Sequence, residues 1–114
     1  MATFTVEALQ KLAEQKYGDF TVEGVTVFKA YLRLAERDRD KVLDLMEQGQ
    51  EDVPNESAAQ TLKRQTKLYR EILTKVADDQ AAAKAWLDPM TADMLVTVFQ
   101  QYAESVQMGE ASGS

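Results

Sequence analysis

Apolar residues recur at helical spacing in the last quarter of the chain. Between Pro89 and Val106 they fall at i, i+3, i+4, i+7 and i+11, the spacing of one helical stripe: Leu95, Val98, Phe99, Tyr102 and Val106. We predict that Asp88 caps this helix and that Pro89 takes its first position, where a missing N–H costs nothing. Residues 108–114 have no such period and are predicted to form a flexible, solvated tail.

The same kind of pattern predicts two more helices in the first half of the chain. Thr5 is the expected N-cap of a helix that runs to Lys16, with an apolar stripe of Val6, Leu9, Leu12 and Ala13. A second helix is expected over Ala35–Gln48, ended by Gly49, with a buried side formed by Val42, Leu45 and Met46.

Two further helices are expected after an acidic loop at residues 49–56. Ser57 is predicted to open a long helix to about Val76, with an apolar side formed by Leu62, Tyr69, Ile72, Leu73 and Val76. Asp78-Asp79 is predicted to end that helix and to cap a short helix over Gln80–Leu87, in which Trp86 and Leu87 are expected to anchor the core.

Between the first two helices the hydrophobic period changes to two. Phe20, Val22, Val25 and Val27 alternate with polar residues around Glu23-Gly24, which predicts a β-hairpin. A two-stranded hairpin is marginal in water, so its apolar face must lie against helices or another chain. After it we expect an extended connection into the core through Phe28, Tyr31, Leu32 and Leu34.

These elements predict an α+β fold that is mainly α. It would contain four to five helices and one small N-terminal β-hairpin near residues 19–28, in a single domain of residues 1–107. Residues 108–114 would follow as the tail. A length of 114 residues is sufficient for one hydrophobic core without disulfide or metal support.

Composition narrows the chemistry that this chain can perform. It has no cysteine and no histidine, which removes thiolate metal sites, cysteine nucleophiles and the usual partner of a catalytic serine. The net charge of −6 argues against nucleic-acid binding. The longest nearly apolar run, Met94–Phe99, is far too short to span a membrane. With no secretory signal at the N-terminus, we expect the protein in the cytoplasm of the cell that makes it.

No enzyme motif, cofactor motif or metal-binding motif is evident, and calcium binding by the acidic loop is disfavoured by its spacing. Contact with other protein is the remaining function. Six residues are candidate contacts, three of them basic and three apolar: Lys63, Lys67, Arg70, Leu95, Phe99 and Tyr102. The basic residues form either a solvated face or a docking surface for an acidic segment, and the apolar ones have a core interpretation as well.

Several stretches of this chain, and the order in which they follow one another, resemble the tail assembly chaperones of long-tailed bacteriophages, especially those of actinobacterial hosts. The most telling are the stretch with Ala77-Asp78-Asp79 and the ending Gly109-Glu110-Ala111-Ser112. They stand beside Lys16-Tyr17-Gly18, Phe20–Val27, Leu32-Arg33-Leu34 and Arg37–Lys41. The chain departs from that family in its middle loop, where a long acidic run is reduced to Glu51, Asp52 and Glu56.

The resemblance implies a non-enzymatic protein that coats the helical tape measure protein until the tail tube forms around it. It also implies a second, longer form made by ribosomal frameshifting near residues 109–114, and absence from the finished virion. The tail tube protein, other copies of this chain and its longer form are further candidate partners. Two alternatives stay open: an inhibitor or adaptor that binds one folded target, and a structural tail or head–tail component.

Overall fold

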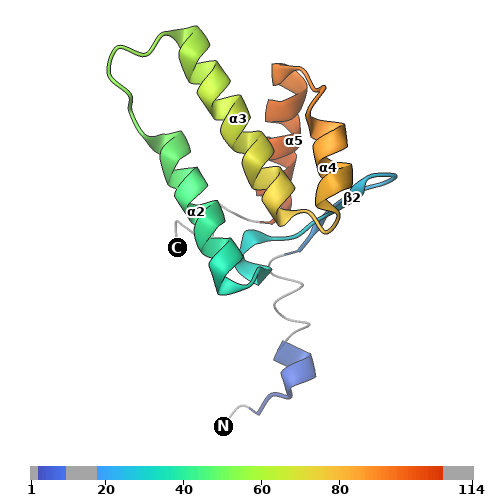
Figure 1. Cartoon of the computed structure of the whole chain (residues 1–114). Helices are drawn as coiled ribbons and strands as arrows, with labels where there is room; N and C mark the ends of the chain where they lie inside the picture. Colours follow the sequence, from blue (N-terminus) through green and yellow to red (C-terminus); the bar gives the residue numbers. More distant parts are fainter. Residues whose placement is uncertain (1–2, 10–17, 107–114) are drawn as a thin grey trace.

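The computed structural model describes residues 3–9 and 18–106 (Figure 1). A two-stranded hairpin, β1 (Phe20–Val22) and β2 (Thr26–Phe28), leads through a short 3-10 helix, η1 (Tyr31–Arg33), into α2 (Glu36–Gln50). Then follow α3 (Ala58–Val76), α4 (Gln80–Leu87) and α5 (Ala92–Ser105). The predicted mainly helical fold with a small N-terminal antiparallel hairpin is confirmed. The predicted tail and the end of the predicted domain at residue 107 lie outside the described residues.

A helical turn begins at residue 6 and is described to residue 9. The Thr5 hydroxyl accepts a hydrogen bond from the Ala8 N–H at 3.0 Å, as an N-cap should. The remainder of the helix predicted to Lys16 lies outside the described residues. Figure 1 shows this turn standing away from the rest of the molecule, and the side chains of Phe4, Val6 and Leu9 are exposed.

The hairpin pairs Phe20 with Phe28 and Val22 with Thr26. The Val25 N–H bonds the Val22 carbonyl at 3.1 Å, and Gly24 has a φ of 80°, a conformation that L side chains rarely adopt. The helices cover the hairpin, as predicted, because Phe28 is completely buried in the core formed with them.

The link between α3 and α4 pairs with the free edge of β2. Lys29 donates its N–H to the Val76 carbonyl at 3.0 Å, and Asp78 donates its N–H to the Val27 carbonyl at 2.9 Å. Phe28 and Ala77 form the antiparallel bridge between these bonds. The link thus gives the short hairpin a third backbone partner and ties it to the helices.

Side-chain caps fix the starts of α3 and α4 where the sequence predicts them. Ser57 and Gln60 form a reciprocal capping box, in which each side chain accepts from the other residue's N–H. The Asp79 carboxylate accepts from the Ala82 N–H at 3.0 Å. Both helix starts are therefore confirmed.

The predicted start of the last helix at Asp88 and Pro89 is wrong. α5 begins at Ala92 with Thr91 as its N-cap, and the Leu95 N–H bonds the Thr91 carbonyl at 3.0 Å. Asp88 instead ends α4, since its N–H bonds the Lys84 carbonyl at 2.9 Å. Continuation of α4 through Leu87 thus leaves Pro89 in the turn between the two helices.

Two other predicted boundaries also differ. Gly49 lies inside α2, which continues to Gln50, and a Cβ at this glycine would lie 3.6 Å from the Leu68 side chain of α3. The connection after β2 contains the 3-10 helix and is not extended throughout, because the Arg33 N–H closes a turn onto the Ala30 carbonyl at 2.9 Å. This turn buries Tyr31.

The core lies between the hairpin and the inner faces of the helices. Its largest fully buried side chains include Phe28, Leu73, Leu87, Leu95 and Tyr102. The prediction that Leu62 lies on the buried side of α3 is wrong, since its exposed fraction is 47%. Leu68 is buried instead, because α2 packs on α3 from a second direction. No helix in the described part of the chain is long and apolar enough to cross a membrane.

Candidate functional site

α3 is the helix around which the others are arranged. It contacts α2, α4 and α5, while α2 packs on α3 and on η1 (Figure 1). An apolar groove lies where α2, α3 and α5 meet, with a volume of about 550 Å³. We name it the α2–α3–α5 groove. Its lining is Tyr31, Leu43, Leu45, Met46, Glu47, Gly49, Gln50, Leu68, Tyr69, Ile72 and Phe99.

The groove presents apolar surface to the solvent. Leu43 has an exposed fraction of 38%, and Leu45, Met46, Tyr69 and Phe99 are half-buried. Glu47 is the one charged side chain among the described residues that line it. Such a surface suits the apolar side of a helix, which binds through side chains about one turn apart.

An aromatic pair connects two walls of the groove. The rings of Tyr69 in α3 and Phe99 in α5 stack with their centroids 4.2 Å apart and an angle of 12° between their planes. Phe99 also contacts Tyr102, at a centroid distance of 6.3 Å. The half-buried Phe99 therefore joins the groove surface to the core.

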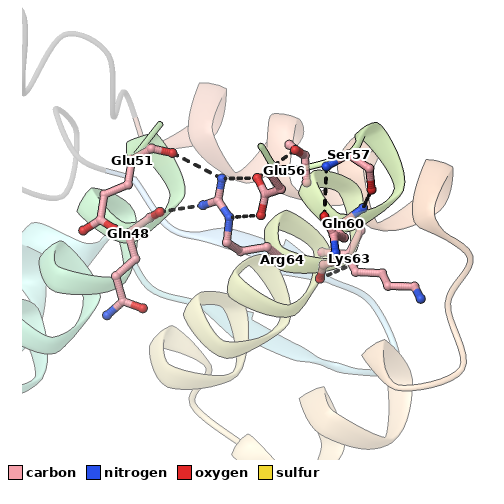
Figure 2. A network of polar contacts seen from close by, with 9 residues as sticks. Gln48, Glu51, Glu56, Ser57, Gln60, Lys63 and Arg64 are labelled. Atoms are coloured by element: carbon pink, nitrogen blue, oxygen red, sulfur yellow. Dashed lines mark hydrogen bonds and ion pairs between the residues drawn. The ribbon is translucent and has the colours of Figure 1, made fainter. Parts of the chain in front are cut away.

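Arg64 fixes the α2 wall relative to α3, as Figure 2 shows. Its guanidinium donates to both carboxylate oxygens of Glu56, from Nε at 3.0 Å and from Nη2 at 3.1 Å. It also donates to the carbonyls of Gln48 at 2.7 Å and Glu51 at 3.2 Å. These carbonyls lie at the C-terminal end of α2, where backbone acceptors lack partners within the helix. One side chain thus joins three consecutive segments of the chain.

The pKa values of this pair shift in the direction that an ion pair produces. The hydrogen bond from Arg64, with one from Thr61, holds the pKa of Glu56 below its ordinary value. The hydrogen bond to Glu56 raises the pKa of Arg64. Glu56 has a side-chain exposed fraction of 12% and Arg64 of 25%. Arg64 is therefore a structural residue, which keeps the hairpin of α2 and α3 in one geometry.

The structure separates the six residues that the sequence offered as partner contacts. Leu95 and Tyr102 are completely buried in the core, whereas Phe99 lines the groove. Arg70 donates to the carbonyls of Leu87 at 3.3 Å and Met90 at 2.9 Å, and so ties α3 to the end of α4.

Lys63 and Lys67 are exposed on α3. Lys63 precedes Ile72 by nine residues, which is about two and a half turns of a helix with 3.6 residues per turn. The two residues therefore lie on opposite sides of α3. Lys63 thus lies on the side of α3 turned away from the groove, whereas Lys67 lines a small hollow with Leu68 and Glu51 at the end of α2. The structure does not test whether any of the six contacts a partner.

A second hollow of about 560 Å³ lies between α2, α3 and α4. Among the described residues, its lining mixes four basic residues with three acidic ones: Lys41, Arg70, Lys75 and Lys84 with Asp44, Glu71 and Asp88. Because it presents both signs of charge, it favours no single class of charged ligand. The α2–α3–α5 groove is the better candidate for a binding site.

Sequence reasoning missed two parts of this groove. Leu68 falls outside the stripe that defines the core side of α3, and nothing in the periodicity signals a second buried side. Met46 was predicted on the buried side of α2, but its spacing of three residues from Leu43, which indicates one shared apolar face, did not lead to the prediction of a groove wall. The chemistry of Arg64 had no local signal, since its acceptors are up to 16 residues away.

The described residues give this site the means to bind protein. In the part of the chain covered by the structure, no cluster of three or more acidic residues could hold a metal ion. The groove supplies apolar side chains from three helices, and the Arg64 contacts hold its walls.

Comparison with known proteins identifies a family for this chain. Neither the curated proteins nor the solved structures show a significant similarity to this chain. A family model, described as mycobacteriophage tail assembly protein, matches residues 1–111, which is nearly the full length. The chain therefore belongs to the mycobacteriophage tail assembly protein family.

Proposed function

We propose that this protein is a tail assembly chaperone that binds apolar helical segments of the tape measure protein in the α2–α3–α5 groove. The observation that supports the proposal most directly is an apolar groove with exposed walls in a member of a tail assembly family. A protein long enough to set the length of a tail exposes many helical segments before the tube surrounds it. Covering those segments keeps them from aggregating.

The size of the groove favours weak individual contacts. Burying one Leu, Met or Phe side chain contributes about 1.5–3 kcal/mol, and a groove of this volume accepts only a few of them. After the cost of association, a single site of this kind reaches roughly millimolar to micromolar dissociation constants. Many copies on one long partner compensate for weak contacts, and weak contacts allow release when tube subunits arrive.

The proposal includes several finer points. The protein acts without catalysis in the host cell cytoplasm and is absent from the finished particle. A longer form arises by frameshifting near residues 109–114, so a slippery heptamer is expected in the codons there. Lys63 and Lys67 attract acidic stretches of the partner during encounter, and Phe99 contacts it directly.

A pull-down with matched variants tests the proposal. Fragments of the tape measure protein should be retained by the wild-type chain and lost with Leu43→Glu, which places a charge on the groove wall. Met94→Glu is the control, because Met94 has an exposed fraction of 45% but does not line the groove. Equal retention by both variants would exclude the groove as the binding site.

Mass spectrometry of purified particles tests the finer claim that the protein does not remain in the virion. Stoichiometric amounts of this chain in mature particles would favour the alternative of a structural tail component.

A further inference from the structure

The N-terminal segment, residues 3–9, exposes apolar side chains that its own fold does not cover. The exposed fractions are 56% for Phe4, 74% for Val6 and 51% for Leu9. The segment is nevertheless organised as a helix start, because Thr5 accepts from the Ala8 N–H at 3.0 Å and the Leu9 N–H bonds the Thr5 carbonyl at 3.1 Å. Phe4 and Leu9 occupy the two positions, before the cap and in the first turn, at which apolar residues commonly face one another. The segment therefore presents an exposed apolar face that is suited to docking on an apolar surface.

The chain joins the body of the molecule beside the α2–α3–α5 groove. Asp19 accepts hydrogen bonds from Arg33 Nη1 at 2.6 Å and from the Ala30 N–H at 3.4 Å. Ala30 and Arg33 flank Tyr31, which lines the groove. The point at which the N-terminal segment is attached is thus held close to Tyr31 of the groove lining.

The length of chain between the N-terminal segment and the body of the molecule limits how far the segment can move from the groove. Residues 10–17, eight in number, separate Leu9 from Gly18, and eight residues span at most about 29 Å when fully extended. Because the segment and the groove belong to one chain, their association is intramolecular and does not weaken on dilution. A second copy of the chain at micromolar concentration competes poorly with such a segment, even for the same contacts.

We propose that Phe4, Val6 and Leu9 occupy the α2–α3–α5 groove of their own chain and are displaced from it by the partner helix. The N-terminal segment then acts as a built-in competitor, which covers the groove when no client is present and lowers the apparent affinity for clients. The docking itself is independent of the proposed function, and only the identity of the displacing helix rests on it.

Because the chain has no native cysteine, a single introduced cysteine can carry a spin label at a chosen position. A nitroxide on Glu7→Cys should broaden the methyl NMR signals of Leu43, Met46 and Leu68 in the groove. Leu62 and Met94, which are exposed but do not line the groove, should broaden less than the groove signals. The same label in a Phe4→Ser, Val6→Ser, Leu9→Ser variant should lose the broadening. That variant should still fold, because these three side chains are exposed.

A mixed sample separates this proposal from docking on a second copy. Spin-labelled chain without isotope is added to isotope-labelled chain without the nitroxide. Broadening that appears in the mixed sample, or no broadening of groove signals in the singly labelled chain, overturns the proposal.

An affinity measurement tests the competition. A fluorescent amphipathic helical peptide from the tape measure protein should bind the triple serine variant about fivefold more tightly, the factor expected if the segment occupies the groove about four-fifths of the time. Equal affinity of the two chains for the peptide overturns the competitor role. If neither chain binds the peptide, the proposed function fails, while the NMR broadening still decides whether the segment docks.

Discussion

Tyr69 and Phe99 stack face to face across the contact between α3 and α5, with ring centroids 4.2 Å apart. Stacked aromatic pairs contribute about 0.5–1.5 kcal/mol beyond the area that they bury. Both residues line the α2–α3–α5 groove, so the same pair stabilises the fold and forms part of the proposed binding surface.

Phe99→Ala should therefore lower the free energy of unfolding by about 2 kcal/mol, less than the 3–5 kcal/mol typical of a fully buried phenylalanine, because Phe99 is half-buried. Urea unfolding measures the change. Met94→Ala, on the exposed surface of the same helix, should change it by less than about 0.5 kcal/mol. A loss for Phe99→Ala as small as that of Met94→Ala would mean that the stack contributes nothing.

Arg64→Ala should lower the melting temperature more than Lys67→Ala does. The first removes four hydrogen bonds that join α2, the following loop and α3, whereas Lys67 is exposed. Arg64→Lys should restore little of the loss, because an ammonium cannot reproduce the paired donors of the guanidinium. Full recovery of the melting temperature with lysine would show that charge alone holds the connection between α2 and α3.

The contribution of Glu56 should depend on pH. Its folded pKa lies below the ordinary value of 4.5, so its stabilising effect is complete above that value and is lost as the pH falls through the folded pKa. The melting-temperature difference between wild type and Glu56→Gln should therefore be largest near neutral pH and shrink below pH 4.5. A difference that stays constant down to about pH 3 would contradict this assignment.

Tyr102→Phe should cost about 1 kcal/mol of stability, because the buried hydroxyl donates to the Lys29 carbonyl at 2.7 Å and joins α5 to the end of β2.

Burial also raises the pKa of Tyr102. The protein should consequently lose stability as the pH rises above the unfolded tyrosine pKa of about 10, where only the unfolded state readily ionises. Chemical denaturation at neutral and alkaline pH measures both effects, and an unchanged alkaline profile in Tyr102→Phe would contradict the second.

Two glycine substitutions should have opposite signs. Gly24→Ala should destabilise by about 1–2 kcal/mol, because Gly24 has a φ of 80° in the hairpin turn. Gly49→Ala should stabilise by up to about 1 kcal/mol, because it lies inside α2 and its new methyl group would meet Leu68 at an ordinary 3.6 Å. Urea unfolding of both variants measures the changes, and effects of the same sign would contradict one of these assignments.

Local signals predicted the parts of this fold that local interactions determine. The Ser57 and Asp79 caps and the hairpin around Gly24 are short-range features, and each was recognisable in the sequence. The predicted cap at Asp88 failed because α4 and the last helix compete for the same residues, and the hydrogen bond from Asp88 to Lys84 decides for α4.

Long-range contacts account for what the sequence could not predict. Leu62 is exposed although burial was predicted for it, and Leu68 is buried although it lies outside the predicted apolar stripe. The reason is that α2 packs beside α3, a contact that the helical periodicity of α3 does not contain. Arg70 was predicted to be part of a basic surface, yet it binds backbone carbonyls of another segment, as Arg64 does. The candidate groove depends on these tertiary contacts, so Phe99 is the one residue of its described lining that is among the six contacts predicted from the sequence.

The solubility of the tape measure protein during co-expression tests the central claim most directly. Wild-type chain and the Met94→Glu control should both keep most of the tape measure protein in the supernatant, and Leu43→Glu should leave it in the pellet. The Leu43→Glu chain itself must remain folded, which circular dichroism can verify. A tape measure protein that stays equally soluble with Leu43→Glu, or that precipitates even with the wild-type chain, would contradict the account.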